Sequence, residues 1–243
     1  MATFFSCILS AVKNRFTALS ALCLLMLSFS HMAVADNHCP EPALSVKEGP
    51  VTTVNEENYS LAETQIIFAD YVQKIAAATC GGGVGQLMHL RDTADPTDRT
   101  ILRINFDTIY SFLILDLSTP ATIVMPETNG RYQSAEVIDE EHYIPFILQE
   151  PGRYELTQEN VGGQYAIVIF RTQVNMGDEE DLKAVHALQD QVQVEQAEPG
   201  SYVVSDAWDM DEILAMRTAY QTRAVQEKVP SEEMAAARGE ITP

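Results

Sequence analysis

The sequence predicts an α+β fold, with an antiparallel β-sandwich or jelly-roll-like core, an N-terminal helix and C-terminal helices. Three observations support this prediction. Apolar residues recur at helical spacing between residues 60 and 80, five short β-branched or aromatic runs follow between residues 110 and 172, and helical spacing returns after residue 178. Short strands separated by turn signals are typical of an antiparallel sandwich or barrel.

Residues 1–35 are typical of an export signal. A weakly basic start with Lys13 and Arg15 precedes an uncharged apolar run, and small residues at positions 33 and 35 suit cleavage after Ala35. We therefore expect a periplasmic or secreted protein with no membrane span after signal cleavage. The alternative is an uncleaved anchor, because the uncharged stretch over residues 16–35 is just long enough to cross a bilayer.

The expected mature chain starts with an N-terminal arm, residues 36–58, which contains Pro and Glu and lacks periodicity. Ser60 and Glu63 then have the spacing of a capping box, which predicts the start of a helix. Its apolar stripe consists of Ile67, Tyr71 and Ile75, and a run of three glycines after Cys80 predicts its end.

The middle of the chain is predicted to form five strands, because its apolar residues are β-branched or aromatic and turn signals separate the runs. These strands cover residues 110–117, 121–125, 131–139, 143–148 and 165–172. Asp178 and Asp209 then precede two amphipathic helices, with a short strand at residues 202–205 between them. We expect one domain over residues 59–228 and a flexible polar tail over residues 229–243.

The charge balance is strongly acidic. The chain has 15 Lys and Arg against 35 Asp and Glu, a formal net charge of −20. Such a surface repels phosphate backbones and anionic lipid, so nucleic-acid binding is excluded as an expected function.

Cysteine usage agrees with export. Cys7 and Cys23 fall within the signal, which leaves Cys39 and Cys80 as a pair in an oxidising compartment. A disulfide would tie the N-terminal arm to the end of the first helix. The alternative is two unpaired thiols.

Several sequence motifs resemble those of the bacterial family catalogued as domain of unknown function 1254. They are RINFDTIYS at residues 103–111, PETNGRY at 126–132, RTQV at 171–174 and EDLKAVHALQD at 180–190. The resemblance covers roughly residues 61–195 and implies a jelly-roll-like β fold without an established activity. Only the first domain of two-domain members is matched: the companion, domain of unknown function 1214, is not recognised after residue 194.

The densest polar cluster comprises Arg103, Asn105, Asp107, Tyr110 and Arg131. Arginines form planar, bidentate contacts with carboxylates or phosphates, so Arg103, Asn105 and Arg131, together with Asp139, are candidate ligands for a small anion. Asp107 and Tyr110 are the candidate catalytic residues, because either side chain could transfer or orient a proton.

A structural interpretation of the same residues stays open. Asn105 and Asp107 suit an Asx turn, and Arg103 or Arg131 could pair with Asp116 or Asp139. No metal site and no cofactor are expected, because the histidines are scattered and familiar cofactor motifs are missing from the sequence.

We therefore expect a binding or assembly module of the cell envelope. Its partner would be a second copy, in a homo-oligomer, or a separately encoded second β-domain protein. The alternative is a hydrolase or lyase-type enzyme that acts on a small anionic or ester substrate through Arg103, Asp107, Tyr110 and Arg131.

Overall fold

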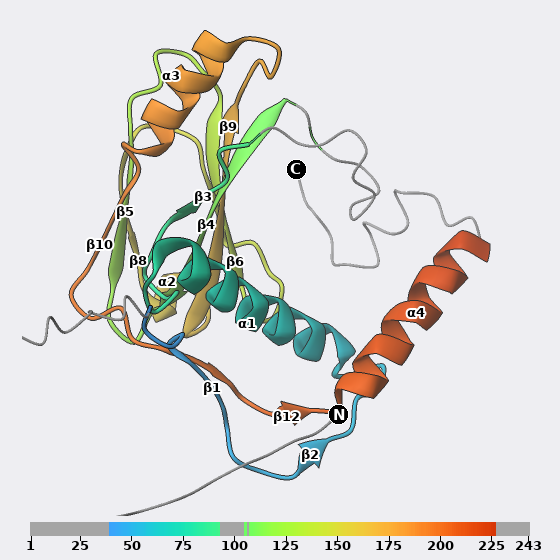
Figure 1. The fold of residues 1–243 in the computed structure, drawn as a ribbon. Helices are drawn as coiled ribbons and strands as arrows, with labels where there is room; N and C mark the ends of the chain where they lie inside the picture. Colours follow the sequence, from blue (N-terminus) through green and yellow to red (C-terminus); the bar gives the residue numbers. More distant parts are fainter. Residues whose placement is uncertain (1–38, 93–104, 106, 227–243) are drawn as a thin grey trace, which may run out of the picture. The chain divides into compact units, whose positions relative to one another are not determined.

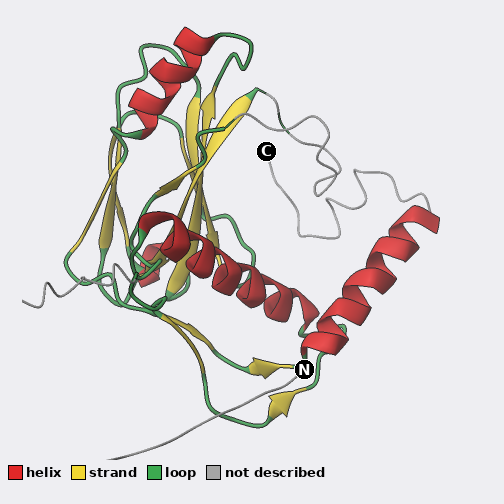
Figure 2. Ribbon diagram, in the orientation of Figure 1, coloured by secondary structure: helices red, strands yellow, loops and turns green. Residues whose placement is uncertain are grey.

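The computed structural model describes residues 39–92, 105 and 107–226 (Figures 1 and 2). The predicted signal, Arg103 and the tail over residues 229–243 lie outside this part. Its helices are α1 (Tyr59–Thr79), α2 (Gln158–Val161), α3 (Glu179–Gln189) and α4 (Met210–Gln226). Its strands are β1 (Leu44–Val46), β2 (Val51–Thr52), β3 (Met88–His89), β4 (Thr108–Asp116), β5 (Ala121–Met125), β6 (Gln133–Asp139), β7 (Phe146–Leu148), β8 (Gly152–Leu156), β9 (Tyr165–Gln173), β10 (Gln193–Gln196), β11 (Tyr202–Val204) and β12 (Ala207–Trp208).

Two antiparallel sheets form the body of the described chain. The larger has the order β3-β4-β9-β6-β7, with β4 and β9 paired along nine residues each, and the smaller has the order β10-β5-β8. The α+β class predicted from the sequence is confirmed.

Alternation along β4 sends its apolar side chains to two different cores. Leu113 and Leu115 belong to a hydrophobic cluster that also contains Ile123 of β5 and Leu156 of β8, so the two sheets share this core. Phe112 and Ile114, on the other face, belong to a second cluster. Both faces of β4 are therefore covered by protein, which explains its continuous apolar run.

Helix α1 covers the second face of the five-stranded sheet, as Figure 1 shows. Its side chains Phe68, Val72 and Ile75 are almost fully buried in the cluster that contains Ile114 and Ile167. Burial of each such side chain contributes about 1.5 to 3 kcal/mol, so this contact fixes the helix on the sheet.

The helix begins two residues earlier than the capping-box pattern predicts. Asn58 is its N-cap, but the Asn58 side chain makes no capping hydrogen bond. The backbone oxygen of Asn55 accepts the backbone N–H of Tyr59. The capping box of Ser60 and Glu63 is not formed, because Ser60 lies within the helix and Glu63 pairs with Arg217 of α4. The helix ends at Thr79, since Cys80 adopts a left-handed conformation with φ 52°.

The segment before α1 contributes two strands that the sequence analysis did not predict. β1 pairs in parallel with β11, and β2 pairs in parallel with β12. A disulfide joins Cys39 to Cys80 across 41 residues, the pairing that the sequence analysis favoured. It connects the start of this segment to the C-terminal end of α1.

Candidate functional site

Asn105 and Asp107 form a local turn at the entrance to β4. The Oδ1 atom of Asn105 accepts the backbone N–H of Asp107 at 2.8 Å, and both residues are exposed. This is the geometry of an Asx turn, so the contact agrees with the structural interpretation of these two residues. Arg103, the third member of the predicted cluster, lies outside the described residues.

Arg131 lies before β6 and binds Asp181 at the start of α3. Its Nη1 atom donates to Asp181 Oδ2 at 3.1 Å and to the backbone oxygen of Gln173 at 2.7 Å, while Nη2 pairs with Asp181 Oδ1. Hydrogen bonds from Arg131 and from the backbone N–H of Asn175 lower the pKa of Asp181 to about 2. The expected partners, Asp116 and Asp139, were wrong, because α3 packs beside the end of β9 and brings Asp181 to the arginine.

Asp139 and Asp116 satisfy backbone groups at strand ends. Asp139 accepts the N–H of Tyr143 at 2.8 Å, and Asp116 accepts the N–H of Ser118 and the side chain of Gln164, each at 3.0 Å. Asp139 ends β6 and Arg131 precedes it, so they are separated by roughly 20 Å of extended strand. The structure therefore does not bring Asp139 and Arg131 into one ligand site.

Tyr110 lies on the face of the five-stranded sheet that α1 partly covers. Arg171 is its cross-strand partner on β9, with the guanidinium 6.0 Å from the Tyr110 ring centroid. The Nη1 atom of Arg171 is 3.1 Å from Glu136 Oε2 on β6. Arg171 and Glu136 were not predicted as neighbours of Tyr110, although each is a charged residue beside apolar residues of its strand.

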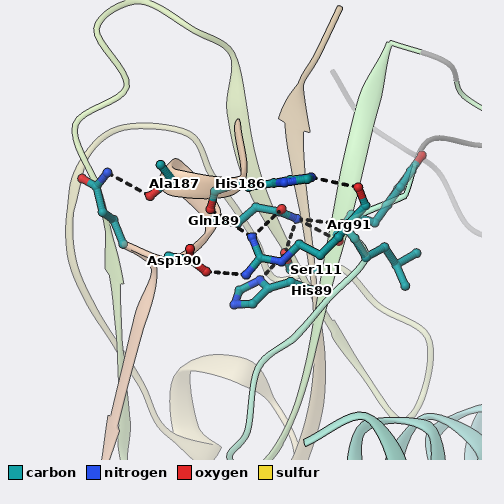
Figure 3. Close-up of polar contacts among 10 residues, drawn as sticks. His89, Arg91, Ser111, His186, Ala187, Gln189 and Asp190 are labelled. Atoms are coloured by element: carbon teal, nitrogen blue, oxygen red, sulfur yellow. Dashed lines mark hydrogen bonds and ion pairs between the residues drawn. The ribbon is translucent and has the colours of Figure 1, made fainter. Parts of the chain in front are cut away.

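A polar network connects α3 to β3 and β4, and Figure 3 shows its members. Ser111 Oγ lies 2.8 Å from His89 Nδ1 and accepts Gln189 Nε2 at 3.0 Å. Arg91 donates to Gln189 Oε1 at 3.1 Å and pairs with Asp190. Burial is the main cause that lowers the pKa of His89, which favours the neutral imidazole at pH 7.

This network does not form an accessible nucleophile. The Ser111 side chain is enclosed, with 2% of its surface exposed, and its oxygen is already engaged by Gln189. Its contacts instead hold the C-terminal end of α3 against the sheet, with His186 Nε2 2.8 Å from the backbone oxygen of Arg91.

A second cluster of polar contacts connects the loop after β6, helix α1 and strands β11 and β12. Tyr202 donates to Glu140 Oε1 at 2.9 Å, and Trp208 Nε1 donates to Gln65 Oε1 at 2.9 Å. Burial raises the pKa of Glu140 and, most strongly, that of Tyr202. The two residues join the loop after β6 to β11.

The outer edge of the larger sheet exposes apolar side chains. β7 is the terminal strand, paired with β6 on one side, and the described residues place no strand on its other side. Tyr143, Ile144 and Ile147 are 64%, 43% and 57% exposed. We call these three residues and the free edge of β7 the β7 edge surface.

The β7 edge surface continues onto the charged pair of the sheet. Ile147 is the cross-strand neighbour of Glu136, which in turn pairs with Arg171. Most edge strands in native proteins are protected by outward charges, prolines or short length. Here the outward position carries isoleucine, although Pro145 and the three-residue length limit the edge.

Comparison with known proteins finds a family match for the part of the chain that forms the two antiparallel sheets. Residues 84–196 match the family model DUF1254, a protein of unknown function. This segment is therefore similar to the DUF1254 family. It contains β3 to β10, and therefore every strand of both antiparallel sheets, whereas α1, α4 and the two parallel strand pairs lie outside it. The family resemblance in the sequence is confirmed.

No curated protein matches the chain. Among solved structures, the chain is similar to the VPA0106 protein from Vibrio parahaemolyticus, with 18% identity and a TM-score of 0.43. The match covers 61% of this chain and 40% of that protein, so it spans less than half of the solved chain.

The described residues contain no group of three or more His, Cys, Asp or Glu side chains arranged to hold a metal ion. Within the same residues, no helix has the length and apolar character needed to cross a membrane.

Proposed function

We propose that this protein is an exported, non-enzymatic assembly module of the cell envelope, built on a jelly-roll-like body. The observation that carries the proposal is the β7 edge surface, where an open strand edge coincides with three exposed apolar side chains. An edge strand offers a row of backbone donors and acceptors to an added strand. Exposed apolar side chains beside that row would supply binding energy when they are covered.

The magnitude of that energy is modest for each residue. Covering the exposed part of Ile147 would contribute about 1 kcal/mol, and Tyr143 and Ile144 would add comparable amounts. Backbone hydrogen bonds to β7 would add about 0.5 to 1.5 kcal/mol each. These contributions suit a specific contact that forms at one edge of the sheet.

Two further features support export and assembly. The Cys39–Cys80 disulfide is typical of proteins in oxidising compartments, as an exported protein requires. The shared core of the two sheets supports a sandwich with jelly-roll-like character.

The enzymatic alternative has less support from the described residues. Arg131, one of its anion ligands, is engaged by Asp181 and by the Gln173 backbone oxygen. Asp107 is exposed at the entrance to β4, and Tyr110 packs beside Arg171 on the sheet face. Their engaged or dispersed positions favour the structural roles of these residues.

Site-specific photo-crosslinking in the cells that produce the protein tests the proposal. A photoreactive side chain at position 147 should form an adduct with a defined protein, whereas the same group at Glu155, exposed on β8, should not. The adduct should disappear when Ile144→Glu is added. Equal adducts at both positions, or none at position 147, would contradict an assembly role for this edge.

A further inference from the structure

The β7 edge surface combines an apolar centre with acidic ends. Glu141 precedes β7 and Glu150 follows it, and both carboxylates are exposed. The nearby cations are already engaged, because Arg153 pairs with Glu195 and Arg171 pairs with Glu136. Among the described residues, no ion pair therefore offsets the negative charge of Glu141 and Glu150 on the two sides of Ile147.

This charge pattern disfavours the binding of a second copy of the same chain at the β7 edge surface. The protein has a formal net charge of −20, so two copies would approach against long-range repulsion. At the interface, the acidic ends of the edge segment would also meet a surface of the same sign, and like charges brought together across an interface are costly.

We infer that the free edge of β7 accepts an extended strand from a basic partner, apolar opposite Ile147 and carrying Lys or Arg on both flanks. This inference rests on the proposed function and names the partner of the same surface. Strand addition explains the apolar centre, since directly opposite side chains on paired strands lie about 4.5 to 5.5 Å apart. Flanking cations would meet Glu141 and Glu150, which sets the partner's chemistry.

The length of the partner strand also follows from the edge. β7 spans Phe146–Leu148, and Pro145 before it has no backbone N–H to donate. Pairing is therefore limited to about three to five residues. A segment of about nine residues, with an apolar middle and two cations at each end, covers the strand and reaches both glutamates.

Two peptides of equal length provide the test with the full-length, disulfide-bonded protein. KKVTVTVKK carries the predicted pattern, and EEVTVTVEE keeps its apolar centre but reverses its charge. By fluorescence anisotropy at low salt, we expect the first to bind at least about tenfold more tightly. Hydrogen exchange should show protection of the backbone amides at 146–149 only when it binds.

Three variants assign the binding to this surface. Ile147→Gln should weaken binding of KKVTVTVKK at least about tenfold, whereas Glu155→Lys on β8 should leave it nearly unchanged. The double variant Glu141→Lys with Glu150→Lys should reverse the peptide preference. Thermal unfolding of each variant shows that it is folded before binding is compared.

The possible failures separate the inference from the proposed function. Equal binding of both peptides, no protection at 146–149, or full binding by folded Ile147→Gln would overturn the inference. If an adduct still forms at position 147 in cells, the assembly role would stand with a partner of other chemistry. A homodimer in analytical ultracentrifugation that Ile147→Gln dissociates would likewise overturn the basic partner and leave assembly in place.

Discussion

At the scale of single residues, the Arg131–Asp181 pair has the clearest energetic role. Replacement Arg131→Ala should lower the free energy of unfolding by about 1 to 2 kcal/mol at pH 7, because it removes a bidentate contact and a bond to the Gln173 backbone oxygen. Urea unfolding measures this loss. Arg153→Ala, which breaks an exposed pair with Glu195, is the matched control and should resemble the wild type.

The same pair predicts a pH dependence. Arg131 lowers the folded-state pKa of Asp181 to about 2, below its unfolded value of about 3.9. The stabilisation is therefore complete above the unfolded pKa and is lost as the pH falls through about 2. The difference between wild type and Arg131→Ala should shrink below about pH 4. A constant difference down to pH 2 would contradict the ion pair as its cause.

Glu140 should act in the opposite direction. Burial raises its folded-state pKa, so its contribution to stability is greatest below the unfolded pKa of about 4.3 and is lost as the pH rises through the folded value. Glu140→Gln keeps an oxygen that can accept the Tyr202 hydroxyl. We expect equal stability at pH 4 and a melting temperature about 2 to 4 °C higher than wild type at pH 8, which corresponds to about 1 kcal/mol.

Thermal unfolding between pH 4 and 8 measures this effect. Glu141→Gln, which changes an exposed neighbour, serves as the control and should be nearly neutral. If Glu140→Gln proved less stable at pH 8 than the wild type, the charged carboxylate would be the stabilising form.

Residue roles were harder to predict than residue positions. Asn105 and Asp107 were correctly seen as turn candidates, because an Asx turn needs only residues adjacent in sequence. The partner of Arg131 could not be predicted in this way, since Asp181 is 50 residues away and reaches it only through the packing of α3. Long-range pairs depend on tertiary contacts that spacing does not encode.

At the scale of elements, the disulfide should determine how firmly the segment before α1 is held. Replacement of both Cys39 and Cys80 by Ser should lower the free energy of unfolding by about 3 to 4 kcal/mol, because the closed loop spans 41 residues. Urea unfolding with and without reductant measures this change. Reductant should destabilise the wild type and leave the double variant unaffected, whereas an equal effect on both would contradict this role.

Strands with a strong local pattern were predicted well. β5 was predicted with its observed bounds, and β4 and β9 within two residues, because β-branched runs bounded by turn signals specify strands locally. β8 was missed, since Gly152 and the charged Arg153 and Glu155 weaken its apolar pattern. It becomes a strand by pairing with β5, which is a tertiary effect.

At the scale of the whole molecule, two kinds of structure combine. The DUF1254-like segment supplies both antiparallel sheets, and the residues on either side of it add α1, α4 and the parallel strand pairs. Phe68 of α1 and Tyr202 of β11 contact each other over the sheet, with ring centroids 5.8 Å apart. The antiparallel sheets were predictable from local sequence pattern. The packing of α1 and β11 on them was not, because these two elements lie far apart in sequence.

The net charge of −20 also acts on the molecule as a whole. Like-charge repulsion destabilises a compact chain and extends over about 30 Å in 10 mM salt, but over less than about 10 Å above 0.1 M. Salt also weakens ion pairs, yet exposed pairs such as Lys74–Asp70 and Lys183–Glu180 are worth little. The stabilisation gained by screening the repulsion should therefore exceed the stabilisation lost from the weakened ion pairs. We expect the melting temperature to rise by several degrees between 10 mM and 0.5 M NaCl in calorimetry, whereas sucrose at equal osmolality should not reproduce the dependence on ionic strength. A stability maximum at the lowest salt concentration would show that the ion pairs, and not the excess carboxylates, dominate the electrostatic energy of the fold.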